Sequence, residues 1–350
     1  MSDWAPIYEL GPGYSSSVFL PTRIIRIFET AIRIERIAEK STAKVLYAHG
    51  WGSLLRSCIA KFLSRGKLKV SWQIYDEEEV ASKGFIFTFV SWLLASVRLI
   101  DQILVLSMKM KRLAEKNLRV TNVFVLRLGL CPELIELSEK HCCDLIKMPE
   151  SLRHLVRTQD EHRIRLYFHD ILIPRRRLED LFHAVATLKE AGITNVILYV
   201  AGSLDRDRPY VNRLRQLIRE LDLSDDVIFL DSLDNDEAIA FWYKYCDFFV
   251  FPCDHQSWGL APLEAMLFGK PVILSLGAGV SEVLAPERLA AIVPPRNPRM
   301  LATSIMNLIK DERMRQKLAI RGRDFVRKNL TYISTGRQLE ELWGFLPRSR

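Results

Sequence analysis

Glu264 lies in a stretch whose residue types could bind both a phosphate and a sugar. Residues 248–251 form an apolar run typical of a buried parallel strand, and Pro252 ends it. Pro262 suits the first turn of a helix, and Gly269 ends that helix. A helix that follows the carboxyl end of a strand directs free N–H groups and a positive dipole end at the crevice above the sheet, where an anion binds. We therefore predict a diphosphate site with Glu264 beside it, able to accept hydrogen bonds from sugar hydroxyls.

Residues 251–273 resemble the sugar-nucleotide signature of the retaining glycosyltransferases with the GT-B fold, in the large group 1 family (family four). That pattern runs from proline through a variable loop to Glu, any residue, an aromatic residue and Gly-Leu, then Glu-Ala-Met and Gly-x-Pro-Val. Nearly all of it is present. The one departure is the first Glu of the pair, eight residues before the second, where this chain has Gln256. The resemblance runs from about Asp101 to the end of the sequence, through residues 100–111, 123–130 and 221–230, and its N-terminal part is weaker.

The resemblance implies that Glu264 holds the nucleotide ribose and that Gln256 contacts the donor sugar, because an amide still hydrogen-bonds hydroxyls. The alternatives are that Glu264 is only a helix-start residue favoured by the dipole, and that Gln256 lies on a solvated loop. The other donor-binding residues implied in this segment are Ser257, Trp258, Gly259, Leu260 and Leu263.

A basic turn, Arg175-Arg176-Arg177, follows Pro174. In the family this turn carries a lysine that grips the donor diphosphate, usually after a Gly-Arg pair. Here Asp170-Ile171 takes the place of that pair and Arg176 the place of the lysine. Arginine binds phosphate through two parallel hydrogen bonds, so the role could survive, and the alternative is a solvated basic turn. Gly202 resembles the family's glycine turn under the donor.

The N-terminal half offers three weaker candidates. Tyr75 stands at a strand end where the family often has a histidine near the transferred sugar, and its hydroxyl could donate to a reacting oxygen. A packed tyrosine at a strand end is the alternative. His49 and Trp51 follow another strand and are assigned to the acceptor side, although His49 could be an ordinary loop histidine. We therefore take Arg176, Glu264, Gln256 and Tyr75 as the catalytic set.

Strands and helices alternate along both halves, which predicts an α/β protein of two doubly wound, Rossmann-like domains facing a cleft, the GT-B arrangement. We expect an acceptor-side domain over residues 1–155, a nucleotide-sugar domain over 156–330, and a C-terminal helix over 331–350 that packs back on the first domain. The polar stretch 149–162 is expected to be the linker.

Composition limits the remaining possibilities. The chain has 350 residues and a formal net charge of +8, with Lys and Arg spread along it, and no nucleic-acid motif is present. No secretory signal pattern begins the sequence, and the six cysteines show no C-x-x-C spacing, so we expect a cytoplasmic protein. The longest apolar run, 85–97, is too short to span a bilayer. With Lys109, Lys111 and Arg112 it predicts peripheral contact with anionic membrane, the alternative being a core helix.

The resemblance implies a metal-independent, retaining hexosyltransferase without a cofactor. It would move a hexose from a nucleoside diphosphate sugar to a glycan or lipid-linked acceptor, in the assembly of polysaccharide, glycolipid or glycoprotein glycans. Asp205-Arg206-Asp207 looks like a metal-binding D-x-D, but we expect it on a surface loop. Two alternatives stay open: a degenerate sugar-nucleotide-binding partner protein, and an NAD-dependent dehydrogenase, against which the lack of a strand-linked G-x-G-x-x-G argues.

Overall fold

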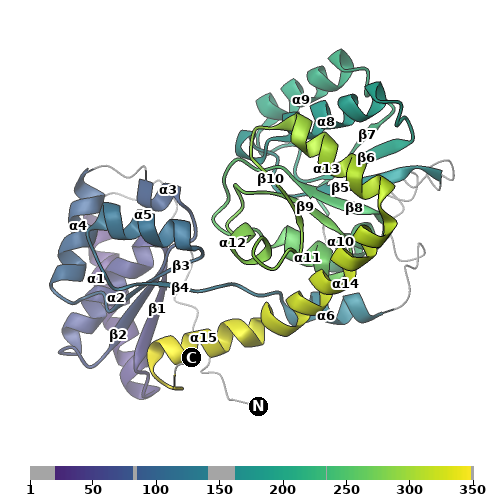
Figure 1. Ribbon diagram of the computed structural model, residues 1–350. Coiled ribbons are helices and arrows are strands. Elements are labelled where there is room, and N and C mark those ends of the chain that lie inside the picture. Colours follow the sequence, from purple (N-terminus) through teal and green to yellow (C-terminus); the bar gives the residue numbers. More distant parts are fainter. Residues whose placement is uncertain (1–19, 82–84, 141–161, 234, 348–350) are drawn as a thin grey trace. The chain divides into compact units, whose positions relative to one another are not determined.

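The computed structural model describes residues 20–81, 85–140, 162–233 and 235–347. The chain folds into two compact units, Met1–Leu126 and Arg127–Arg350. Figure 1 shows parallel strands covered by helices in each of them. The calls on residues 1–19, on Cys142 and Cys143, and on most of the expected linker lie outside the described residues.

The first unit is built on a parallel sheet whose strands follow chain order, β1-β2-β3-β4. The fully buried Trp72 and Ile103 are paired on neighbouring strands and anchor its core. The strands are β1 Val45–His49, β2 Lys69–Gln73, β3 Gln102–Val105 and β4 Val123–Val125. The helices are α1 Leu20–Lys40, α2 Gly50–Leu63, α3 Glu78–Ala81, α4 Phe85–Ser96 and α5 Met108–Leu118.

An ion pair between the buried Lys61 and the half-buried Asp101 fixes this sheet to α2. The ammonium of Lys61 lies 2.6 Å from Asp101 Oδ2 and also donates to the carbonyl of Arg98. The same Asp101 oxygen accepts from the N–H of Val70 at the start of β2. The charge of Lys61 is therefore matched by a carboxylate and a carbonyl, as burial of an ammonium requires.

The second unit contains a six-stranded parallel sheet of order β10-β9-β8-β5-β6-β7. From the central β5 the chain builds outward through β6 and β7, then returns to β8 on the other side of β5 and builds outward again. This reversal creates a switch point between β5 and β8. The strands are β5 Ile164–His169, β6 Val196–Ala201, β7 Val227–Asp231, β8 Phe248–Phe251, β9 Val272–Ser275 and β10 Ala291–Val293.

Helices pack in two groups around this sheet. α8 packs against α9 and α13, and α11 packs against α14 and α6. In Figure 1 the strands pass between these groups. The helices are α6 Pro132–Glu139, the 3-10 turn η3 Pro174–Arg176, α8 Leu178–Glu190, α9 Arg208–Glu220, α10 Asp236–Tyr245, α11 Ala261–Leu267, α12 Ser281–Leu284, α13 Pro298–Lys310, α14 Glu312–Asn329 and α15 Tyr332–Trp343.

The second unit joins two parts of the chain that are far apart in sequence. The N–H of Leu130 donates to the carbonyl of Leu330, and the N–H of Tyr332 donates back to Leu130. A Cβ on Gly129 would lie 2.2 Å from the Thr331 carbonyl, so only glycine allows this approach. Residues 127–139 thus group with the second unit. The predicted boundary after residue 155 falls outside the described residues and stays a prediction, as does the return of residues 331–350 to the first domain.

The apolar pattern of the sequence predicts helices over residues 54–64 and from about 211 to 221, and in the structure both begin earlier. α2 starts at Gly50 instead of near Leu54, so Trp51 belongs to its first turn rather than to a loop. α9 starts at Arg208 instead of near Val211, because the Asp207 side chain accepts from the N–H of Tyr210 and caps the helix. The helix α6 was not predicted at all.

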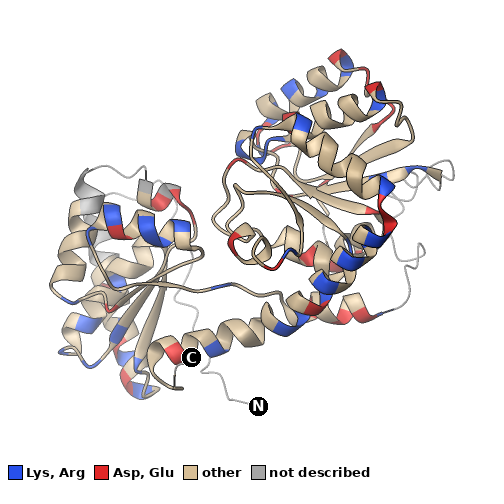
Figure 2. Ribbon diagram, in the orientation of Figure 1, with Lys and Arg blue, Asp and Glu red and all other residues tan. Residues whose placement is uncertain are grey.

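Charges of both signs are mixed over the helices of each unit, and Lys and Arg recur along α14 (Figure 2). No helix in the described part of the chain combines the length and the apolar character needed to cross a bilayer.

Candidate functional site

The candidate site lies at the switch point of the second unit. Ligands of open parallel sheets bind outside the carboxyl ends of the strands, where the strand order reverses. The segments that follow β5 and β8 both begin there: residues 170–177 lead into α8, and residues 252–260 lead into α11. The basic turn and the Glu264 motif, which are separated by about 90 residues in sequence, are joined by a hydrogen bond of 2.9 Å from the N–H of Asp254 to the carbonyl of Arg175.

The loop before α11 is held by backbone pairing rather than by side chains. The N–H of Gln256 donates to the carbonyl of Gly277, and its carbonyl accepts from Gly279. A Cβ on Gly277 would lie 2.1 Å from the carbonyl oxygen of Asp254, so the two loops pack backbone to backbone. Gln256 is half-buried, and within the described residues its side-chain amide makes no hydrogen bond. The amide is therefore available to a ligand.

Glu264 is half-buried in the first turn of α11 and makes one strong side-chain contact. The hydroxyl of Tyr243, on α10, donates to its Oε2 at 2.7 Å. Burial raises the pKa of Glu264, the hydrogen bond from Tyr243 opposes that rise, and the negative charges of Asp170 and Asp236 add to it. Glu264 is thus a carboxylate in an environment that disfavours its charge, as is common at binding sites.

His169 ends β5 next to this pair. Its Nδ1 lies 3.4 Å from the Tyr243 hydroxyl, and burial lowers the pKa of the imidazole, so the ring is neutral near pH 7. The polar groups of His169 on β5, Tyr243 on α10 and Glu264 on α11 therefore lie in a row of hydrogen-bonding contacts that ends at the switch point.

Two arginines of the basic turn, Arg176 and Arg177, pair with carboxylates. Arg176 is buried, with Nε 2.9 Å from Asp170 Oδ2 and Nη2 3.1 Å from Oδ1. Arg177, in the left-handed region at φ 56°, pairs with Asp180 at 2.7 Å, and this carboxylate raises its pKa. The alternative of a solvated basic turn is wrong for Arg176, which is buried. Its phosphate role stays a prediction, and a diphosphate would have to share Arg176 with Asp170.

The other predicted donor residues differ in what they can offer. Trp258 is buried and its indole N–H donates to the carbonyl of Leu128 at 3.0 Å, so a ligand could use only its main chain. Leu263 is fully buried in the core and Ser257 is buried, whereas Leu260 is exposed. Gly202 lies under the switch point, because a Cβ there would come within 2.1 Å of the carbonyl oxygen of Asp170.

In the first unit, the predicted acceptor-side residues lie close together. The Tyr75 hydroxyl is 2.6 Å from His49 Nδ1, and the two rings stack at 5.6 Å between centroids. Both side chains are exposed at the carboxyl ends of β1 and β2, where Tyr47 packs on His49 at 4.3 Å. Partial burial lowers the pKa of His49. Trp51 packs edge-on against the core residue Trp72 and is only partly available.

Sequence reasoning missed Tyr243, His169 and the pairing of Asp170 with Arg176. Asp170 could have been found, since a carboxylate in the place of a family glycine invites the question of which cation balances it. Tyr243 carried no signal, because it lies on a helix that reads as ordinary core.

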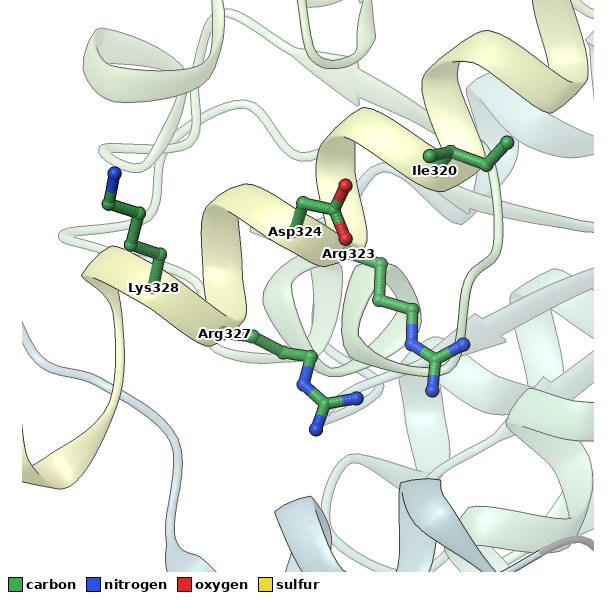
Figure 3. Close-up of a pocket in the computed structure, with 5 residues that line it drawn as sticks. All are labelled: Ile320, Arg323, Asp324, Arg327 and Lys328. Atoms are coloured by element: carbon green, nitrogen blue, oxygen red, sulfur yellow. The ribbon is translucent and has the colours of Figure 1, made fainter.

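Two surface cavities lie away from the switch point. One of about 540 Å³ lies on α14, lined by Ile320, Arg323, Asp324, Arg327 and Lys328. Figure 3 shows that Arg323 and Arg327 extend to one side of the helix and Lys328 to the other, so these cations do not converge on one anion. The second, of about 390 Å³, lies at the amino ends of β5, β8 and β9.

The D-x-D sequence has a structural use in this fold. Asp207 caps α9, and Asp205 pairs with Arg208 on the exposed surface at 2.8 Å. Among the residues that the structure describes, no group of three or more His, Cys, Asp or Glu side chains is arranged to hold a metal ion.

Known proteins resemble the second unit in sequence. Residues 156–325 match the family described as glycosyl transferases group 1. The chain is 27% identical over 175 residues to a D-inositol 3-phosphate glycosyltransferase of Corynebacterium efficiens, which covers 49% of this chain and 40% of that protein. It is 25% identical over 162 residues to the GDP-mannose-dependent alpha-(1-6)-phosphatidylinositol monomannoside mannosyltransferase of Mycobacterium tuberculosis, covering 44% and 40%. The match therefore spans about 40% of the length of these relatives.

Solved structures extend the likeness over nearly the whole chain. HepE of Anabaena, crystallised in complex with UDP, superposes with a TM-score of 0.76 at 19% identity, covering 91% of this chain and 82% of HepE. A glycosyltransferase of Rickettsia africae gives 0.77 at 16% identity, covering 97% and 85%. The expected GT-B fold is confirmed by these neighbours. Residues 156–325 belong to the group 1 glycosyltransferase family, as the resemblance indicated.

Proposed function

We propose that the chain is a retaining, metal-independent hexosyltransferase whose second unit binds a nucleoside diphosphate sugar at the switch point. The observation that carries the proposal is Glu264, a half-buried carboxylate at the start of α11 within the part that matches the family. In this proposal Glu264 accepts hydrogen bonds from the ribose, and the Gln256 amide meets the transferred sugar. Of the proteins named above, the mannosyltransferase is described as GDP-mannose-dependent and HepE was crystallised with UDP, which supports this donor class.

The protein's part in the reaction is position and charge. Binding both reactants in fixed geometry removes the entropic cost of bringing them together, and positive groups stabilise charge that develops on the leaving diphosphate. Arg176 is the group proposed for this role. In a retaining reaction without a protein nucleophile, the leaving diphosphate takes the proton of the acceptor hydroxyl, which attacks the same face of the sugar. A glycan or lipid-linked hydroxyl is the proposed acceptor.

Substitutions at the two motif positions test donor binding. Glu264→Ala removes an acceptor for ribose hydroxyls, and a lost hydrogen bond to a charged group costs about 1.5–3 kcal/mol, on the order of tenfold to hundredfold in affinity. It should weaken UDP or GDP and their sugars alike in calorimetric titration. Gln256→Ala should weaken the nucleotide sugar far more than the bare diphosphate. Unchanged affinities in Glu264→Ala would refute the site.

A second function, a nucleotide-sugar-binding partner without turnover, is favoured by the Asp170–Arg176 ion pair. That pair commits the proposed diphosphate cation to a carboxylate. Donor hydrolysis or transfer by the wild-type chain decides between the two. Activity that persists in EDTA supports metal independence, and NMR of the product's anomeric proton tests retention. Strict dependence on Mg²⁺ or Mn²⁺ would overturn the metal-independent mechanism.

We also propose peripheral contact with the cytoplasmic face of an anionic membrane, through α4. Phe89, Trp92 and Leu93 of α4 and Val97, directly after it, are 46%, 37%, 41% and 56% exposed. This does not fit a core helix. Phe62, 74% exposed, lies next to Lys61, whose contact with Arg98 brings the ends of α2 and α4 together.

The basic residues first expected at this surface are largely matched by acids, since Lys109 pairs with Glu77 and Lys111 with Glu115. Binding should therefore be weak and lost at high salt. Liposome flotation at low salt should recover the wild-type chain but not a Phe89→Ser, Trp92→Ser variant. Ile320→Ser, an exposed site on α14, is the control. Equal flotation of all three proteins would exclude α4 as the contact.

A further inference from the structure

Tyr243 occupies a position in the second unit that core packing alone does not explain. Its ring is fully buried, stacks on Phe268 at 5.6 Å between centroids and meets Tyr167 edge-on at 5.4 Å. A phenylalanine would make the same contacts. The hydroxyl is the part that core packing does not require, and it points at Glu264 Oε2, 2.7 Å away.

The hydroxyl engages one carboxylate oxygen and leaves the other. Within the described residues Oε1 of Glu264 accepts no hydrogen bond. A tyrosine hydroxyl has one proton to give, so donation to Oε2 leaves its lone pairs for a second group. His169 Nδ1 is this second group, 3.4 Å from the hydroxyl oxygen of Tyr243. The carboxylate is thus held at one oxygen by a rigid, packed phenol, while its other oxygen remains available.

We propose that Tyr243 is a positioning residue, whose hydroxyl orients the Glu264 carboxylate so that Oε1 meets the ribose of the bound nucleotide. The inference rests on the proposed function, because it assigns the ligand of Glu264 from it. An acidic side chain with free rotamers loses affinity through the entropy of ordering it, and a second group that fixes it beforehand removes that cost.

The groups around Glu264 make the proposal sensitive to pH. Asp236 acts on it from α10 together with Tyr243, and Asp170 acts on it from the loop after β5. The pKa of Tyr167, on β5, is raised by burial and also by the charge of Glu264, and His169 is neutral. The carboxyl pKa is raised by burial, and the Tyr243 hydrogen bond is the contact that lowers it. Without the hydroxyl, Glu264 should gain its proton at higher pH and stop accepting from the ribose.

Tyr243→Phe tests the idea, since it keeps the ring and removes the hydroxyl. Calorimetric titration with UDP and with GDP from pH 5 to 8 should show affinity several-fold weaker at pH 8, with the loss on acidification displaced to higher pH. The ¹³C-carboxyl titration of Glu264 in the ligand-free protein should move in the same direction. Tyr245→Phe, on the same helix against Tyr199 and Phe241, is the matched control and should leave both readouts unchanged.

A double variant separates positioning from structure. In a Glu264→Gln background, Tyr243→Phe should change neither the affinity nor its pH dependence, whereas a general loosening of the core would weaken binding again. If the wild-type chain binds and Tyr243→Phe behaves like it, the role of Tyr243 is overturned and the proposed function stands. If the wild-type chain binds neither nucleotide, the proposed function fails and the ribose role fails with it.

Discussion

The two units contain parallel sheets of different strand order, and strand order determines where a ligand-binding site can form. In the first unit the strands run β1-β2-β3-β4 in chain order, so every crossover moves the same way. In the second, β5 and β8 are neighbours from which the chain departs in opposite directions. In sheets of this kind the helices after the two central strands diverge, and ligands bind in the crevice at that point.

Buried polar groups follow the same division. At the switch point an ion pair, a tyrosine–glutamate hydrogen bond and a neutral histidine come together from β5, α10, α11 and the loop after β5. In the first unit the Lys61–Asp101 pair ties α2 to the sheet, and the polar cluster at the strand ends is exposed. In the second unit the buried charged and hydrogen-bonded side chains thus lie where the strand order reverses. Substitutions can test how much stability depends on them.

The largest effect is expected at Gly202. A Cβ there would lie 2.1 Å from the carbonyl oxygen of Asp170, at φ 150°, so Gly202→Ala forces β5 and β6 apart and should cost more than about 4 kcal/mol. Gly66→Ala in the first unit is the control, because its Cβ meets nothing within 4 Å and only the positive φ of 78° costs, about 1 kcal/mol. Urea denaturation measures both, and equal losses would contradict the comparison.

The ion pairs should rank next. Asp170→Asn leaves the buried Arg176 without a counter-charge, which typically costs about 3–5 kcal/mol. Asp101→Asn should cost less, because Lys61 keeps the Arg98 carbonyl and Asp101 is more exposed, at 31% against 13% for Asp170. Thermal unfolding of both variants gives the order. Adding Arg176→Met to Asp170→Asn should recover stability, and failure to do so would show that Arg176 is not the group left unpaired.

The smallest effect concerns the two histidines. Burial lowers the pKa of both His169 and His49 below the usual 6.5. The unfolded chain therefore binds protons first as the pH falls, so stability is full above about pH 6.5 and declines below it. His169→Gln should reduce the loss of Tm between pH 7.5 and pH 5.5 more than His49→Gln does, since His169 is the less exposed. The reverse order would place the titrating group in the first unit.

Features of the fold and site could be predicted where the residues that form them are close together in the sequence. Residues 248–273 hold strand, loop, helix and strand in one run, so the placement of Glu264 at a helix start followed from the sequence and is confirmed. The GT-B fold followed from the same motif. Tyr243 and His169 meet Glu264 only because β5, α10 and α11 converge, and no spacing in the sequence encodes that contact. α6 was missed because its partners, α10 and α11, lie about 100 residues later.

The pairing of Leu130 with Leu330 and Tyr332 also sets an order of events during synthesis. Residue 331 leaves the ribosome about 200 residues after residue 129, which at about 5–20 residues per second is a delay of roughly 10–40 s. Through that interval, while the strands β5 to β10 are made one after another, the segment at Leu130 has neither its backbone partners nor the contacts of α15. The nascent chain therefore carries an open edge at Gly129 until α15 is made, and a chaperone that binds extended backbone would find its target there.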